Sequence, residues 1–383
     1  MQAFEYIRAD DVASAVALVS GDPTAQYLAG GTTQVDLMLK DGVLEPERLV
    51  DITRLPLRGI TRDGDVLRVG ALATMEELAT DVTVAERLPF VRDALLASAS
   101  TQLRNMATIG GNILQRTRCR YFRDTSVAAC NKRAPGSGCA AISGAARMHA
   151  ILGASEHCIA LHASDLCVSL VALDAVAHIQ GPEAQRSVPL TEFYVVPGDR
   201  PDVENVLRHG ELLTAIDIPL LPPGTRSGYL KVRDRASYEF ALTSAAVALA
   251  ISDGVIARAR VALGGVGTIP WRAPEAEAVL RGAPAGAQVF RAAADAAVHD
   301  PFTVPGTASK VELAKRTLVR ILETLTEPTP SASRASGRSA LWESPPRSPT
   351  ASTTPPAGGS ARCRSPSASF SDGRRAGPVG RWP

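Results

Sequence analysis

Five of the six cysteines in this 383-residue chain fall between Cys119 and Cys167, while Cys363 stands alone near the C-terminus. Cysteines grouped in this way indicate metal binding more than disulfides when no secretory signal accompanies them. The first four of the group are Cys119, Cys130, Cys139 and Cys158, spaced C-x10-C-x8-C-x18-C. Without a C-x2-C pair, this spacing argues against a zinc ribbon or a bacterial ferredoxin run, and it leaves a [4Fe–4S] cluster, zinc or free thiols open.

The residues around these cysteines are mostly cationic or small. Cations and glycine amides would offset the charge of four thiolates. The group comprises Arg116, Arg118, Arg120, Arg123, Lys132, Arg133, Gly136 and Gly138. Cys167 lies in the apolar run DLCVSLVAL and is interpreted as a core residue. His149, His157 and His162 belong to no H-E-x-x-H or nucleophile pattern, so we interpret them as packing or loop residues, with His157 as an alternative metal ligand.

Two loops with paired glycines could hold a phosphorylated cofactor. In the first, YLAGGTT over 27–33, adjacent glycines would let backbone N–H groups approach a pyrophosphate closely, and a following helix start would add a favourable dipole. Its spacing is not the G-x-G-x-x-G of a Rossmann turn, so an NAD fold is not supported. The second loop, ATIGGN over 107–112, repeats the design. Two such loops could clamp one extended cofactor.

Periodicity and capping patterns predict the elements that would position these groups. A strand near 4–7 precedes a helix whose apolar face carries Val12, Val16 and Val19, capped by Asp10 or Asp11. A strand at 48–52 follows a helix beginning near Thr33, which makes a β-α-β start. Further expected elements are strands at 66–70 and 212–218, a helix after the Thr74-x-x-Glu77 capping box, and a longer helix over 88–100.

Prolines at 219, 222 and 223 with Gly224 break the chain and predict a boundary between domains at 1–222 and 225–325. Beyond it, the runs 245–251 and 255–263 flank Ser252-Asp253-Gly254, which predicts a β-hairpin because Asp and Gly accept positive φ. The second domain would close on a helix with one apolar face. That face carries Ala314, Leu318, Ile321, Leu322 and Leu325.

Residues 327–383 differ in composition from the rest of the chain. They include ten prolines and twelve serines and predict a disordered, low-complexity tail, and their Arg-rich, Lys-free content suggests a frameshift. This segment carries a net charge of +5, which leaves −3 on residues 1–326. The acidic body excludes a basic footprint for nucleic acid, and no run approaches the roughly 20 apolar residues of a membrane span.

Taken together, the two loops resemble those of the flavoprotein subunits of the xanthine dehydrogenase and carbon monoxide dehydrogenase family, the molybdenum hydroxylases. The likeness extends over 1–325, through VGALAT at 69–74 with Glu77, HASD at 162–165, and VALGGV at 261–266 followed by Pro270-Trp271-Arg272. It implies an α+β fold. A two-subdomain FAD-binding domain of the p-cresol methylhydroxylase (PCMH) type would be followed by a smaller α+β C-terminal domain of the CO dehydrogenase flavoprotein type.

This resemblance assigns roles to particular residues. Those that would bind FAD are Leu28, Ala29, Gly30, Gly31, Thr32, Thr33 and Gln34 on one side, and Thr108, Gly111 and Asn112 on the other. Asp165 would hydrogen-bond a polar edge of the cofactor, or else cap the helix that follows it. Lys231 and Arg233 would reach the flavin, or else form structural ion pairs. No catalytic acid or base is assigned.

The cysteine loop, about 116–160, resembles one branch of the family in particular, the flavoprotein subunits of bacterial periplasmic aldehyde oxidoreductases, which carry an extra [4Fe–4S] cluster. This resemblance makes Cys119, Cys130, Cys139 and Cys158 the expected cluster ligands. The alternative for them is buried structural thiols.

The implied function is electron transfer in a molybdenum-dependent aldehyde oxidoreductase. In a heterotrimer, a large subunit would carry molybdopterin, a small subunit two [2Fe–2S] clusters, and this chain FAD, which would pass electrons to an external acceptor. The N-terminus does not resemble a signal peptide, so we expect either periplasmic location by co-export with a partner or cytoplasmic location. The alternatives are a free-standing FAD oxidase or dehydrogenase and a zinc-binding interaction protein.

Overall fold

Three short parallel strands begin the fold, in the order β1-β3-β2. The computed structural model describes residues 3–327, so the predicted tail lies outside the described residues except for Glu327. Parallel neighbours require crossovers, and helices supply both here. The elements are β1 (Glu5–Arg8), α1 (Val12–Ser20), β2 (Ala25–Leu28), α2 (Gln34–Leu39) and β3 (Arg48–Asp51). The predicted β-α-β start is confirmed, and Asp11 caps α1.

A five-stranded antiparallel sheet follows, in the order β4-β5-β8-β6-β7. Strand β8 is the last strand of this sheet in sequence order, yet it lies between β5 and β6. Residues near 215 therefore complete a sheet that begins near residue 60. The strands are β4 (Ile60–Asp63), β5 (Val66–Gly70), β6 (Val176–Gln180), β7 (Gln185–Pro189) and β8 (Leu212–Pro219). The two sheets agree with the predicted two-subdomain arrangement.

Short helices pack beside this sheet around a shared apolar core. They are α3 (Met75–Thr80), α4 (Val82–Arg87), α5 (Pro89–Ala97), α6 (Thr101–Arg104), α7 (Ile109–Ile113), α10 (Asp165–Ala172) and α11 (Leu190–Phe193). The Thr74–Glu77 capping box is present at α3. The single helix predicted over 88–100 is wrong at its C-terminal end. Ser98 is extended and Ala99 has φ of +49°, so the chain turns out of α5 after Ala97.

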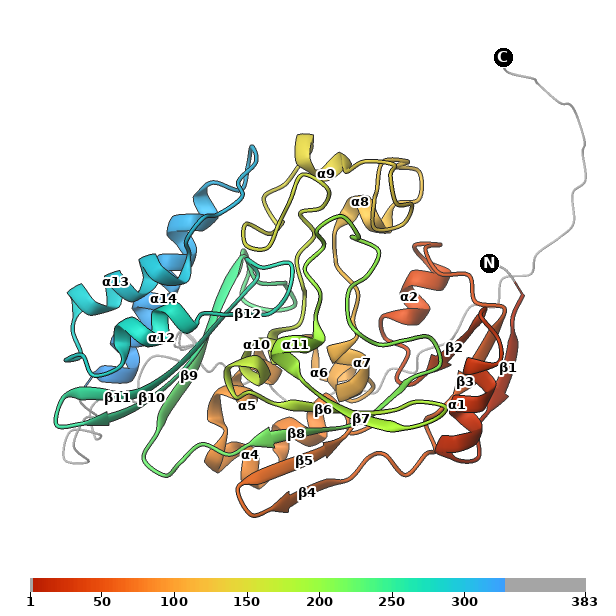
Figure 1. Ribbon diagram of the computed structural model, residues 1–383, viewed down its shortest axis with the longest axis horizontal. Helices are drawn as coiled ribbons and strands as arrows, with labels where there is room; N and C mark the ends of the chain where they lie inside the picture. The colour runs from red at the N-terminus through yellow and green to blue at the C-terminus, as the bar shows by residue number, and fades with distance from the viewer. Residues whose placement is uncertain (1–2, 328–383) are drawn as a thin grey trace, which may run out of the picture. The chain divides into compact units, whose positions relative to one another are not determined.

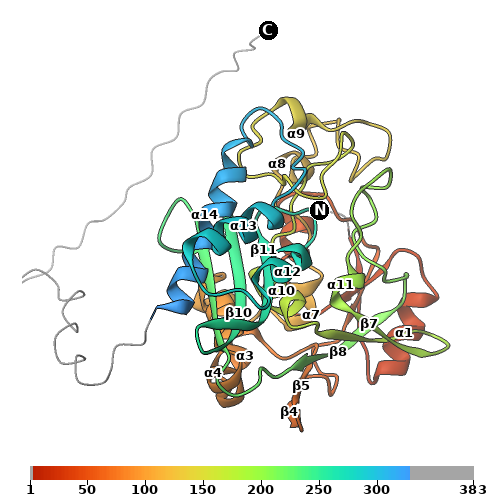
Figure 2. The same cartoon turned by 60° about the vertical axis from the view of Figure 1, so that its left-hand side comes forward.

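The segment that contains the candidate cluster cysteines has little regular structure. Between α7 and α10 it forms only two single-turn helices, α8 (Arg120–Arg123) and α9 (Ala140–Ser143). Figures 1 and 2 both show α8 and α9, in yellow, on an excursion away from the five-stranded sheet. The conformation of this segment therefore depends on side-chain contacts more than on the repeated backbone hydrogen bonds of helices and sheets.

The C-terminal part is a four-stranded antiparallel sheet, β12-β11-β10-β9, covered by three helices. Its elements are β9 (Arg226–Val232), β10 (Thr243–Ser252), β11 (Val255–Gly264), β12 (Trp271–Arg272), α12 (Pro274–Leu280), α13 (Ala287–Ala297) and α14 (Ser309–Thr326). Asp253 and Gly254 both have positive φ, as the predicted hairpin requires. Helix α14 buries Ala314, Leu318, Ile321 and Leu322 against the sheet.

Helices α5 and α10 lie where the two halves of the fold meet. Helix α5 contacts β9, and helix α10 contacts β10 and β11 of the C-terminal sheet, while the apolar residues of both helices belong to the first core. Residues 3–327 therefore form one compact unit, and the boundary near 222–225 stays a prediction. Within these residues no helix combines the length and apolarity needed to cross a membrane.

Candidate cofactor sites

A cavity of about 680 Å³ opens where both glycine loops meet the C-terminal sheet, a size within the range of small-molecule and cofactor sites. Eleven of the residues predicted to bind FAD line it. They are Ala29, Gly30, Gly31, Thr32, Thr33, Gln34, Thr108, Gly111, Asn112, Asp165 and Lys231. Leu28 is not among its lining residues and ends β2, where its carbonyl accepts a hydrogen bond from the Ile52 N–H group.

The first glycine loop needs glycine because it touches the second glycine loop. A Cβ on Gly30 would lie 1.9 Å from the carbonyl oxygen of Met106, so only a hydrogen fits there. Gly31 has φ of +69°, which strains other residues. Within residues 3–327 the backbone N–H groups of Gly31, Thr32 and Thr33 have no acceptor. These N–H groups are the donors that a pyrophosphate needs.

The second glycine loop is held against the segment before α3. The Ile109 and Gly110 N–H groups donate to the carbonyls of Ala73 and Ala71, each at 2.8 Å. The Thr108 hydroxyl caps α7 by accepting from the Gly111 N–H group at 3.2 Å. The motif at 69–74 therefore serves as the support on which the second glycine loop is built, a role that its sequence does not reveal.

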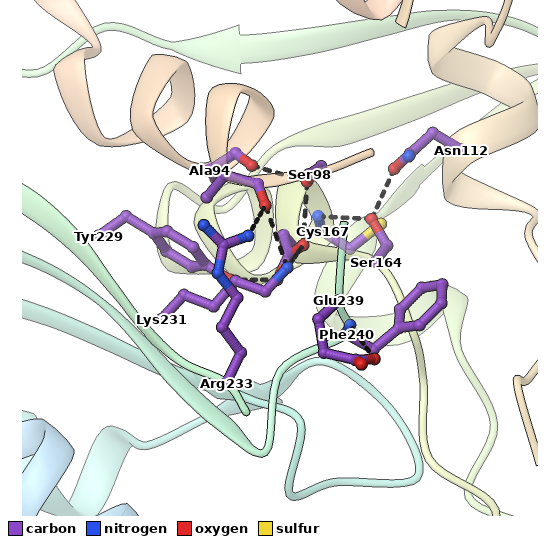
Figure 3. A network of polar contacts seen from close by, with 12 residues as sticks. Ala94, Ser98, Asn112, Ser164, Cys167, Tyr229, Lys231, Arg233, Glu239 and Phe240 are labelled. Carbon is purple, nitrogen blue, oxygen red and sulfur yellow. Dashed lines mark hydrogen bonds and ion pairs between the residues drawn. The ribbon is translucent and has the colours of Figure 1, made fainter. Parts of the chain in front are cut away.

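Asp165 is the centre of a buried polar network, and its partners Ser98, Tyr229 and Lys231 are labelled in Figure 3. Its carboxylate accepts hydrogen bonds from Tyr229 at 2.6 Å and from Ser98 at 3.0 Å, and it pairs with Lys231 at 2.8 Å. The side chains of Asp165 and Lys231 are only 7% and 4% exposed. Burial, and then the neighbouring carboxylate, raise the pKa of Tyr229 well above its usual value, so its hydroxyl stays a donor.

This network settles the alternatives for Asp165 and Lys231 in part. The hydroxyl of Ser164, not Asp165, caps α10, so the helix-cap interpretation of Asp165 is wrong. The ion-pair interpretation of Lys231 is confirmed, and its ammonium also donates to the Ala97 carbonyl at the end of α5. The pair thus joins α10 and α5 to β9 at the edge of the cavity, and contact of either residue with a cofactor stays a prediction.

The four predicted cluster ligands come together around a second, much smaller cavity. Cys119, Cys130, Cys139 and Cys158 all line it. Cys130 and Cys139 face each other across an antiparallel bridge, and Cys158 lies in a tight turn with Ser155. Cys167 is elsewhere, buried in α10 with its sulfur 3.0 Å from the hydroxyl of Tyr194, as expected for a core residue.

Buried and partly buried hydrogen bonds hold these loops together. The side chain of Asn131 accepts from the Gly138 N–H group at 2.7 Å and donates to the His157 carbonyl at 2.9 Å, which joins the Cys130–Cys139 turn to the loop of Cys158. The Thr117 hydroxyl donates to the Leu161 carbonyl and accepts from the N–H group of Cys119. No sequence pattern singles out either Asn131 or Thr117.

The cations around the cysteines mostly have other partners, which corrects the expectation that they offset thiolate charge. Arg118 and Arg123 pair with Asp36, Arg116 with Glu204, and Arg133 binds backbone carbonyls. These ion pairs join the cysteine segment to the first glycine loop, because Asp36 lies on α2, directly after that loop. Burial raises the pKa of Cys158, and Lys132, which also pairs with Glu204, partly offsets that rise.

Burial dominates the chemistry of the thiols. It raises the pKa of Cys119 to about 12 and raises that of Cys158. These groups are therefore neutral at physiological pH unless a metal replaces the proton. No three His, Cys, Asp or Glu side chains of the described residues meet closely enough for a single metal ion. A cubane cluster differs in that each thiolate binds its own iron, so its ligands need not converge on one point.

Comparison with known proteins decides the family. The profile for the FAD binding domain in molybdopterin dehydrogenase matches residues 2–221, and that for the CO dehydrogenase flavoprotein C-terminal domain matches residues 228–325. The chain belongs to the FAD-binding subunits of the molybdenum hydroxylases. It is thus a subunit of an oxidoreductase, and the family and fold class predicted from the sequence are confirmed.

Individual members of this family match over most of their length. The aldehyde oxidoreductase FAD-binding subunit PaoB of Escherichia coli K12 is 46% identical over 326 residues, covering 84% of this chain and 98% of that protein. The carbon monoxide dehydrogenase medium chain of Hydrogenophaga pseudoflava is 28% identical, covering 77% of this chain and 86% of its own. A structure of carbon monoxide dehydrogenase from Hydrogenophaga pseudoflava gives a TM-score of 0.66 at 27% identity, over 85% of this chain and 97% of the other.

Proposed function

We propose that this family member carries both FAD and a [4Fe–4S] cluster and transfers electrons within a molybdenum-dependent aldehyde oxidoreductase. The 46% identity to an aldehyde oxidoreductase subunit supports the substrate class. The observation that carries the cluster is the convergence of Cys119, Cys130, Cys139 and Cys158 on one buried cavity. Bound FAD accepts two electrons one at a time and a [4Fe–4S] cluster relays one, which is the redox chemistry that electron transfer from an aldehyde to an external acceptor requires.

In this proposal the protein binds FAD through backbone groups. The unpaired N–H groups of Gly31, Thr32 and Thr33 would donate to the pyrophosphate, and Thr108, Gly111 and Asn112 would enclose it from the opposite loop. Asp165 and Lys231 would fix the third wall, because their ion pair ties β9 to α10. These side chains orient the cofactor and exclude water, and none acts as an acid or base on an aldehyde.

The chain also brings the two proposed cofactors close together. Arg118 lines the large cavity, and the next residue, Cys119, lines the small one. Ala163 lines the large cavity five residues after Cys158, which lines the small one. Two separate segments therefore run directly from one site to the other, and this proximity supports a shared role in electron transfer.

The remaining parts of the proposal follow from the family. A large subunit would hold the molybdopterin that oxidises the aldehyde and a small subunit would hold two [2Fe–2S] clusters. Residues 1–222 and 225–325 would be the two domains of this chain, and 327–383 a low-complexity or frameshifted tail. Export with a partner would place the complex in the periplasm, and otherwise it would act in the cytoplasm.

Absorption spectroscopy of the purified complex with Cys130→Ser tests the cluster assignment. We expect the variant to lose the broad shoulder at about 400 nm that the cluster of this chain contributes and that dithionite bleaches, while it keeps the flavin bands. Cys167→Ser is the matched control, because Cys167 is also buried but does not line the small cavity. Equal iron in the wild type and in Cys130→Ser would overturn the ligand set. Flavin with no cluster would favour a simple flavoprotein, and zinc without iron an interaction role.

A further inference from the structure

One histidine makes direct contact with a cysteine of the small cavity. The Nε2 atom of His149 lies 3.2 Å from the sulfur of Cys119, within hydrogen-bonding range for sulfur. His149 comes from the loop after α9, thirty residues beyond Cys119, and is only 4% exposed. No other histidine of the described residues has a hydrogen bond to a cysteine sulfur.

Contacts from three directions hold the His149 residue in place. Its N–H group donates to the Ala146 carbonyl at 2.8 Å, and its carbonyl accepts from the ammonium of Lys310, at 2.8 Å. Lys310 comes from α14, is 2% exposed, and also donates to the Gly265 carbonyl. The ring lies beside Tyr121, with centroids 6.0 Å apart. These contacts hold the backbone of His149 and place its ring beside Tyr121, with Nε2 on the sulfur of Cys119.

The hydrogen bond has a preferred direction. Within the described residues the other ring nitrogen, Nδ1, is buried and has no partner. A proton on Nδ1 would be an orphaned buried donor, which proteins avoid more strictly than an orphaned acceptor. The tautomer with its proton on Nε2 avoids that cost and donates to Cys119. A donor aimed at sulfur suits an anionic, metal-bound thiolate, which accepts a hydrogen bond more strongly than the weakly accepting sulfur of a free thiol.

We propose that His149 donates an Nε2–H···Sγ hydrogen bond to the Cys119 ligand and thereby raises the reduction potential of the cluster. This inference rests on the proposed function, because it requires a cluster at Cys119. Hydrogen bonds to the sulfurs are among the factors that set cluster potentials, since they stabilise the additional negative charge of the reduced state. His149 is thus a positioning residue that sets the potential of the cluster, and the hydrogen bond from Lys310 to its carbonyl holds it in place.

The potential of the cluster, measured by redox titration monitored by electron paramagnetic resonance, tests this proposal. The protein is the full chain in its complex. His149→Phe removes the donor, and we expect its midpoint potential to shift downward from that of the wild type. His149→Gln keeps an N–H donor on a side chain of similar reach and should recover most of the shift. An unchanged midpoint in His149→Phe would overturn the inference.

His157→Phe is the matched control. His157 also lines the small cavity, but its ring nitrogen faces Asp199, at 3.4 Å, and not a sulfur. We expect its cluster to have the wild-type potential. A downward shift as large as that of His149→Phe would mean that any aromatic replacement near the cavity perturbs the cluster, and the specific role of His149 would be refuted.

A measurement on the wild type covers the case in which the variants fail to assemble. In protein labelled with nitrogen-15 at histidine, pulsed hyperfine spectroscopy of the reduced cluster should detect one histidine nitrogen and one exchangeable proton coupled to it. A cluster signal without these couplings contradicts the role of His149. If the wild type has no cluster signal beyond those of its partners, the proposed function fails first, so the two failures are distinguishable.

Discussion

Replacement of Gly30 by alanine probes the contact between the two glycine loops. The added Cβ would lie 1.9 Å from the Met106 oxygen and 2.9 Å from its carbonyl carbon, both of them backbone atoms that no side-chain rotation can move away. Ordinary van der Waals contact begins at 3.4 Å, so the loops must separate by about 1.5 Å. Overpacking of this kind costs about 1–3 kcal/mol.

That cost appears in cofactor binding if both loops must close on FAD together. Since each 1.4 kcal/mol is about a factor of ten, we expect Gly30→Ala to bind FAD roughly 5- to 140-fold more weakly than the wild type. Titration of flavin-free protein, followed by quenching of FAD fluorescence, measures this. Gly59→Ala is the control, because nothing lies within 4 Å of the position that its added methyl group would take and its φ is not positive. Wild-type affinity in Gly30→Ala would refute the loop contact as the basis of the site.

Three further predictions concern buried polar groups. Lys231→Met leaves the Asp165 carboxylate without its ion-pair partner and should lower the free energy of unfolding, measured by urea titration, by about 3–5 kcal/mol. The double variant that also carries Asp165→Asn should recover part of this loss. No recovery in the double variant would contradict the pairing. Burial lowers the pKa of Lys310 to about 7 from 10.5, so the unfolded chain binds more protons between these values and stability should rise with pH across that window, by up to about 1.4 kcal/mol per pKa unit. The free energy of unfolding of Lys310→Met, measured as a function of pH, should lack that rise. A rise as large as that of the wild type would contradict the lowered pKa of Lys310. Asn131→Ala removes the hydrogen bonds that join the loops of Cys130 and Cys158, so it should reduce the iron content of the purified protein while FAD is retained. Full iron content would show that these hydrogen bonds are not needed to hold the cluster.

Local patterns predict the elements that local interactions determine. The Thr74–Glu77 capping box begins a helix, and Asp253-Gly254 forms the hairpin turn, because the atoms involved are three or fewer residues apart. The helix predicted over 88–100 ends early for a tertiary reason. Ser98 leaves the helix, and its hydroxyl lies 2.7 Å from the Ala94 carbonyl and 3.0 Å from Asp165, a residue 67 positions away that the sequence of the helix does not reveal.

The same distinction applies to the candidate sites. The resemblance identifies the residues around the large cavity, and all but Leu28 line it. The resemblance does not reveal the ion-pair and hydrogen-bond partners of these residues. Six cations near the cysteines predict a local counter-charge, yet Arg118 and Arg123 pair with Asp36, more than eighty residues earlier. The roles of His149 and Asn131 depend on contacts between loops, and a loop sequence carries no periodicity from which such contacts follow.

Counting iron and acid-labile sulfide against FAD in the intact complex tests the central claim most directly. Two [2Fe–2S] clusters on a partner and one [4Fe–4S] cluster on this chain predict about eight irons and eight sulfides per FAD. Cys119, Cys130, Cys139 and Cys158 would account for half of that iron. A ratio of about four would mean that this chain holds FAD alone, and the convergence of its cysteines would then be structural.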